Sequence, residues 1–211
     1  MKKNTYFTIL LFTLLMSSSF SQGYYFNIGK NFTKYDYKNS QGQRNNNLKS
    51  DSGIMVDFGY QWALTNDEKL QYKAGISYQQ FNNLGKNSIY NYSWISNYLG
   101  IQNSFSVALY TSNNREAFIK LVTGLSALKI INGKQLINNT EYDLTKEAEF
   151  KGLFIQPNIG LENEFYINEL IQIGLGYRLS KAFNISNNST EKLSFDNNTI
   201  YVNFKYYILR D

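Results

Sequence analysis

Apolar and polar residues alternate along most of this chain, which is the pattern of β-strands with two different faces. The clearest run, residues 54–64, places Ile, Val, Phe, Tyr, Trp and Leu on one face and Met, Asp, Gly, Gln and Ala on the other. Similar runs occupy residues 24–37, 70–79, 95–109, 119–126, 153–165, 171–180 and 200–208. The pattern therefore predicts eight strands and an all-β fold.

The connections between these runs alternate in length. Residues 65–69, 111–116 and 168–169 form short turns, whereas residues 38–51, 82–93, 132–152 and 184–194 form long polar loops. Short turns at one end and long loops at the other are typical of an antiparallel up-and-down transmembrane barrel. The even strand count predicts that both chain ends lie on the short-turn side. The strands are expected to match the roughly 9–11 residues that a tilted crossing requires.

A soluble β-sandwich or a lipocalin-like barrel is the alternative, because alternation alone does not say which face is inside. Glycine on the polar face favours the membrane barrel. A narrow eight-stranded barrel needs small inward residues beside large ones, whereas glycine on a solvated face would only weaken a strand. The glycines on this face are Gly29, Gly59, Gly75, Gly100, Gly124, Gly160, Gly174 and Gly176.

Aromatic residues on the apolar face also favour a bilayer, because membrane barrels carry an aromatic girdle at each interface. Those expected near the short turns are Tyr24, Tyr60, Trp62, Tyr72, Phe165 and Tyr206. Those expected near the long loops are Phe32, Tyr78, Trp94 and Phe183.

With this pattern the chain resembles the small eight-stranded outer-membrane barrels of the OmpA and OmpX type, and more closely the outer membrane β-barrel domain proteins of Gram-negative bacteria. The resemblance covers residues 24–210 and rests on architecture, not on a catalytic motif. It implies an outer-membrane location, contact with membrane lipid and lipopolysaccharide, and insertion by the barrel insertion machinery.

The N-terminal segment has the pattern of a signal peptide. Lys2 and Lys3 precede an apolar run at residues 6–16, and serines follow. This run is shorter than the roughly 20 residues of a spanning helix. We expect a signal peptide at 1–21 and an outer-membrane barrel domain at 22–211. Without the signal peptide, 19 basic and 16 acidic groups remain, and a net charge of +3 does not favour nucleic acid.

Cysteine and histidine are both absent, which removes several classes of chemistry. Disulfides, zinc–thiolate sites and nucleophile–histidine pairs all need a residue that this chain lacks. The active sites of outer-membrane barrel enzymes depend on a histidine, which this chain lacks, so the resemblance implies that the chain is not an enzyme. We expect no cofactor and no metal.

The charged residues on the polar face are the candidate site. By the face assignment the lumen holds Asp57, Lys73, Lys120, Glu162, Glu164, Arg178 and Lys205. Inside a narrow barrel such charges must pair or meet water, so a salt-bridge network that plugs the lumen is favoured over an ion path. Glu162 and Glu164 share one face at i, i+2, which would also allow a cation site.

The sequence therefore predicts a monomeric, non-enzymatic outer-membrane barrel with a plugged polar lumen. Its role would be structural, adhesive or accessory to secretion, with the long loops contacting an extracellular ligand or partner. A narrow channel for ions or small solutes is the first alternative. A soluble periplasmic lipocalin-like carrier is the second, and it would place Asp57 and Lys73 in solvent.

Overall fold

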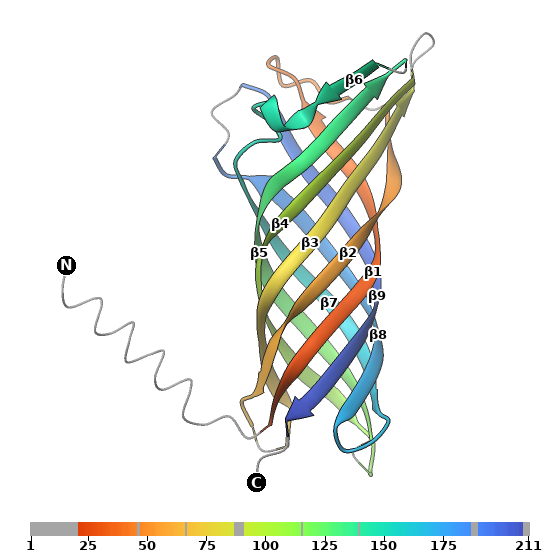
Figure 1. Cartoon of the computed structure of the whole chain (residues 1–211), viewed down its shortest axis with the longest axis vertical. Helices are drawn as coiled ribbons and strands as arrows, with labels where there is room; N and C mark the ends of the chain where they lie inside the picture. Colours follow the sequence, from red (N-terminus) through yellow and green to blue (C-terminus); the bar gives the residue numbers. More distant parts are fainter. Residues whose placement is uncertain are drawn as a thin grey trace, which may run out of the picture.

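The computed structural model describes residues 21–45, 47–65, 67–86, 91–114, 116–138, 140–186 and 190–208. Residues 1–20 of the expected signal peptide lie outside these ranges. Eight long strands of the described chain build one barrel (Figure 1). They are β1 (Gln22–Lys38), β2 (Leu48–Ala63), β3 (Leu70–Lys86), β4 (Asn91–Thr111), β5 (Ala117–Ile137), β7 (Leu153–Tyr166), β8 (Ile171–Asn184) and β9 (Lys192–Ile208).

The strands form a closed antiparallel ring in the order β4-β3-β2-β1-β9-β8-β7-β5, which the pairing of β4 with β5 completes. The first and last strands lie side by side, and Gln22 pairs with both Trp62 and Ile208. Closure leaves no strand of the ring with an unpaired edge. The predicted all-β, eight-stranded up-and-down barrel is therefore confirmed, with both described chain ends on the side of the short turns (Figure 1).

No helix in the described part of the chain is long and apolar enough to cross a membrane.

The predicted strand and loop lengths were wrong at the long-loop end. The barrel strands have 14 to 21 residues, and β5 continues to Ile137 through a region expected to be loop. It then pairs with a short strand, β6 (Thr140–Asp143), which a 3-10 turn, η1 (Leu144–Lys146), follows. The polar stretches extend the strands because backbone pairing does not require apolar side chains, and outside a bilayer both faces of a strand can be polar.

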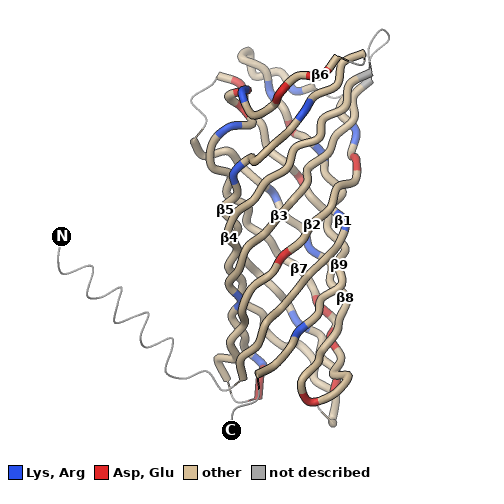
Figure 2. Tube along the Cα trace, viewed as in Figure 1, with Lys and Arg blue, Asp and Glu red and all other residues tan. Residues whose placement is uncertain are grey.

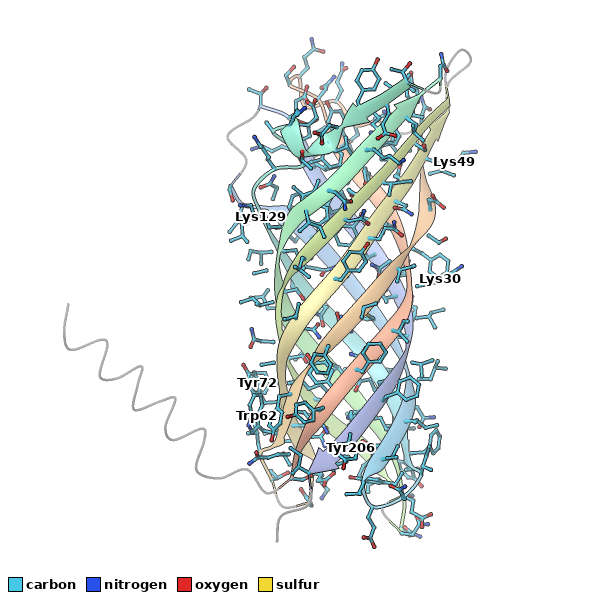
Figure 3. All side chains as sticks on the ribbon, viewed as in Figure 1. Lys30, Lys49, Trp62, Tyr72, Lys129 and Tyr206 are labelled. Carbon is cyan, nitrogen blue, oxygen red and sulfur yellow. The ribbon has the colours of Figure 1, made fainter. Side chains whose placement is uncertain are left out.

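The two faces of the strands are sorted as the alternation predicts. Large apolar side chains on the outer face are well exposed, among them Phe58 at 51%, Ile101 at 60% and Leu175 at 59%. Trp62, Tyr72 and Tyr206 lie near the short-turn end, and Lys30, Lys49 and Lys129 lie closer to the other end (Figure 3). The outside of the barrel is therefore an apolar belt with aromatic residues at its short-turn margin.

The predicted girdle near the long loops was wrong at Trp94. It shares the parity of Ser96 and Tyr98 on β4, both of which are buried inside the barrel, and its ring lies 6.3 Å from that of Tyr35. Trp94 therefore faces the lumen and does not belong to the outer girdle. The size of tryptophan suggested a lipid contact, but strand parity decides the face.

Inward glycines make room for two buried tyrosines, as the glycine pattern predicts. An added Cβ on Gly176 would overlap the ring of Tyr201, and one on Gly59 would come within 2.8 Å of the ring of Tyr25. Both tyrosines are only 1% exposed. The large ring on one strand thus occupies the space that glycine leaves on a nearby one.

Candidate functional site

All seven charged residues assigned to the lumen from the sequence lie inside the barrel. Arg178 is the most exposed of them at 7%, and Asp57, Lys120 and Glu164 are completely buried. Charged positions occur along the height of the barrel and are not confined to its ends (Figure 2). Four cationic side chains meet three carboxylates, so the charges must be considered as a network.

Glu164 on β7 is the centre of the network nearest the short turns. Its carboxylate forms ion pairs with Lys120 of β5, at 2.7 Å, and with Lys205 of β9. Gln71 accepts a hydrogen bond from each lysine through Oε1, at 3.0 Å and 3.4 Å. Asn203 donates to the Glu164 carboxylate at 3.2 Å. One buried carboxylate therefore holds two ammonium groups from different strands.

Glu162 forms the next layer with Lys73 of β3. Lys73 Nζ lies 2.6 Å from Glu162 Oε2, and the hydroxyl of Tyr201 donates to Glu162 Oε1 at 2.8 Å. The two residues are 89 positions apart in the chain, and the contact crosses the lumen from β3 to β7. Both oxygens of Glu162 are therefore paired with side chains of other strands.

Asp57 forms a third layer with Arg178 of β8. Arg178 Nη2 lies 2.9 Å from Asp57 Oδ2, and Ser77 donates to Asp57 Oδ1 at 2.7 Å. The guanidinium also lies over the ring of Tyr201, 4.8 Å from its centroid. Tyr201 thus contacts both the second and the third layer and connects them.

Neutral amides replace the charges further from the short turns. Gln79 and Gln156 exchange hydrogen bonds at 2.8 Å and 3.0 Å, and Gln156 also donates to Ser180. Thr199 donates to the buried Asn31 at 2.6 Å. The lumen therefore changes from ionic to neutral polar with height.

Above the amides the lumen becomes apolar, which the sequence analysis missed. The buried cluster consists of Tyr35, Leu48, Phe81, Tyr98, Leu128, Leu144, Phe150, Phe154, Ala182, Leu193 and Phe195. Phe195 is its centre, with ring centroids 4.7 Å from Phe81 and Tyr35 and 5.0 Å from Phe154. Strand parity could have revealed it, because these aromatic residues share the face of the polar lumen residues on their strands.

The segment after β6 folds over this apolar end. Leu144 of η1 is 1% exposed and Phe150 is 5% exposed, although both belong to a stretch expected to be a polar loop. Asp143 caps η1 by accepting hydrogen bonds from the hydroxyl and the backbone N–H of Thr145, and these bonds hold the pKa of Asp143 below its usual range. The segment therefore acts as a cover whose apolar side chains pack into the barrel mouth.

Glu162 and Glu164 are both paired with lysines, so their arrangement does not support the cation site that the sequence would allow. Each carboxylate is occupied by lysine, and no cluster of three or more metal-ligating acids occurs among the described residues. The arrangement is that of a filled interior: ionic near the short turns, amide-lined in the middle and aromatic near β6. It brings together buried charges, and it does not form an acid–base pair facing an open cleft.

Asp57 and Lys73 also distinguish the barrel from the soluble carrier. The carrier alternative predicts that both side chains lie in solvent, whereas Asp57 is 0% exposed and Lys73 is 2% exposed. The apolar residues that a carrier would bury are on the outside instead. The inside-outside assignment of the carrier is therefore wrong for this chain.

No protein-family model and no curated protein matches the sequence. The solved structures that are similar in overall fold, with low sequence identity, include the following three. Neisserial surface protein A has a TM-score of 0.47 and 12% identity, over 87% of this chain and 97% of that one. OprG, an outer membrane protein of Pseudomonas aeruginosa, has a TM-score of 0.46 and 11% identity, over 92% of this chain and 99% of that one. Ail, the attachment invasion locus protein of Yersinia pestis, has a TM-score of 0.41 and 11% identity, over 89% of this chain and 99% of that one. The fold itself is established by the strand pairing of this chain.

Proposed function

We propose that this chain is a non-enzymatic outer-membrane barrel with a plugged lumen, which displays the β6–η1 end at the cell surface in a structural, adhesive or secretion-accessory role. The observation that carries this proposal is the inverted distribution of side chains. Apolar residues cover the outside of a closed ring, and ion pairs, amides and aromatic rings fill the inside.

The outer surface supports a bilayer as the surroundings. Soluble monomers rarely expose continuous apolar patches above a few hundred Å². Here Phe58, Ile76 and Ile101 occupy paired positions on three adjacent strands, and each is more than half exposed. A belt of this kind is stable in hydrocarbon and would aggregate in water. The expected signal peptide gives the export route to the outer membrane.

The filled lumen supports a structural barrel over a channel. A conducting path must pass both the Glu164 layer and the rings around Phe195, each built from buried side chains. Ions would have to break the pairs or move the rings. We expect the folded protein to give no stable unitary conductance in planar bilayers, and steady single-channel steps would favour the channel.

Lysines on the outer face suggest where the barrel meets lipopolysaccharide. Lys30, Lys49 and Lys129 are exposed on the outer face, closer to the β6 end of the barrel than to the short turns (Figure 3). Ammonium groups at this height would pair with the phosphates of an anionic outer leaflet. The belt below would meet the acyl chains.

Ile101→Lys compared with Ile185→Lys tests the membrane location. Both isoleucines are about equally exposed, at 60% and 62%, but Ile101 lies in the middle of β4 and Ile185 lies beyond the end of β8. A lysine at the bilayer midplane costs about 2–4 kcal/mol, whereas one near the interface costs about 0–1 kcal/mol. We expect Ile101→Lys to lower the unfolding free energy in phospholipid vesicles by this larger amount and Ile185→Lys to change it little.

The measurement is denaturant unfolding of vesicle-inserted protein, in which the folded fraction is read from the mobility shift between unheated and boiled gel samples. Equal effects of the two substitutions would contradict a bilayer around β4. Recovery of the wild-type protein in the soluble periplasmic fraction would contradict the proposal as a whole.

A further inference from the structure

A cavity of about 360 Å³ opens at the barrel mouth, where the β6–η1 segment meets the strand ends. Its volume lies within the range of small-molecule sites, roughly 300–1,000 Å³. Five aromatic side chains line it: Tyr35, Tyr37, Trp94, Tyr142 and Phe150. It lies above the plugged part of the lumen, so its occupant need not cross the barrel.

The floor and one wall of the cavity are fixed in place. The hydroxyl of Tyr35 lies 2.9 Å from both the carbonyl oxygen of Phe81 and Oγ of Ser96, which holds its ring. Phe150 packs 6.0 Å from this ring and Trp94 packs 6.3 Å from it. The aromatic walls are thus preorganised, which reduces the entropic cost of binding.

Carboxylates gather at the same cavity. Glu147 and Glu149 line it, and the Tyr37 hydroxyl donates to Glu191 at 2.6 Å. Burial raises the pKa of the Glu149 carboxyl, and the carboxylates of Glu191 and Glu147 raise it further.

Among the described residues no lysine or arginine lines the cavity, and two lysines, one on β5 and one on η1, pair with other acids. Lys146 lies 3.5 Å from Asp143, and Lys134 lies 3.2 Å from Glu141. Glu149 therefore lies beside other carboxylates, and a bound cation would relieve their mutual repulsion.

We infer that this cavity binds an organic cation with an apolar body, such as a quaternary or aryl ammonium compound. Aromatic faces attract such cations through their quadrupoles, and the carboxylates at the rim add charge complementarity. An anion would be repelled by the same carboxylates. The inference goes beyond the proposed structural role, and it does not depend on which membrane the barrel spans.

Trp94 offers a direct reading of binding, because the chain has only two tryptophans and Trp62 lies at the opposite end of the barrel. In a Trp62→Phe background, the full mature barrel is folded in a maltoside detergent. Phosphocholine detergents are avoided because they carry the proposed ligand group. Benzyltrimethylammonium is titrated at constant ionic strength, with benzyl alcohol and benzenesulfonate as neutral and anionic comparisons.

We expect saturable quenching of Trp94 by benzyltrimethylammonium and at least tenfold weaker binding of the other two compounds. Glu149→Gln should weaken cation binding about tenfold, which corresponds to about 1.4 kcal/mol. Glu141→Gln is the matched control, because Glu141 is an exposed acid on β6 that pairs with Lys134. It should leave the affinity unchanged.

Equal binding of benzyl alcohol and the cation, or unchanged affinity in Glu149→Gln, would overturn the inference and leave an apolar cavity without charge preference. Absence of saturable binding in calorimetry as well as fluorescence would overturn it too. Each variant is first checked by the mobility shift on boiling, so a misfolded barrel is not mistaken for a lost site.

Discussion

Glu164→Gln should lower the unfolding free energy of the barrel by about 3–5 kcal/mol, the usual result of removing one partner from a buried ion pair. The substitution keeps the shape of the side chain and removes the only carboxylate that pairs with both Lys120 and Lys205 among the described residues. Two completely buried ammonium groups would then face each other beside Gln71 without a counter-ion. Denaturant unfolding in vesicles measures the loss.

Lys205→Met is the informative comparison, because it keeps the Glu164–Lys120 pair and equalises cations and carboxylates in the lumen. We expect a loss well below that of Glu164→Gln, since replacing a buried charge by an apolar side chain of similar volume is often tolerated. Glu141→Gln, at an exposed pair on β6, should change stability by less than about 1 kcal/mol. If Glu164→Gln were as mild as Glu141→Gln, the layer around Glu164 would have to be hydrated rather than packed.

Gly176→Val should prevent or strongly impair folding, with a cost above the roughly 1–3 kcal/mol of ordinary overpacking. A Cβ at this position overlaps the Tyr201 ring, and that ring is held by its hydrogen bond to Glu162 and by Arg178 above it. The ring therefore cannot move aside without breaking two charged layers. Folding yield, read as the heat-modifiable band after refolding into vesicles, is the measurement.

A double-mutant cycle isolates the steric cause. Gly176→Ala and Tyr201→Ser should each destabilise the barrel, whereas the double variant should be more stable than the sum of the two losses predicts, because the smaller side chain at 201 leaves space for the new Cβ. Strictly additive losses would show that Gly176 is required for a reason other than the Tyr201 ring.

Much of the fold was predictable because strand alternation is a local property. The run at residues 54–64 already separates Phe58 from Asp57, and the structure places the first outside at 51% exposure and the second inside at 0%. Loop lengths were less predictable. The segment at residues 132–152 is polar like a loop, yet β5 extends through part of it, because pairing depends on the neighbouring strand and not on apolar content.

For the candidate site, too, one part was predictable from the sequence and another was not. Membership of the lumen follows from parity, so all seven charged residues could be assigned to it from the sequence. Their partners could not, because Lys73 and Glu162 are 89 positions apart and meet only when β3 and β7 face each other across the closed ring. The mouth cavity was missed for a related reason: Trp94 and Phe150 come from separate segments that tertiary packing brings to one place.

The sequence by itself determined the face of most strand residues, the positions of the short turns and the exclusion of histidine- and cysteine-dependent chemistry, since these depend on residue type and on a period of two along a strand. Only the tertiary structure decided the pairing of the buried charges, the change from an ionic to an aromatic lumen and the cover formed by Leu144 and Phe150. The physical reason is that closure of the ring sets the height and the opposite neighbour of every inward side chain, and both are properties of all eight strands together.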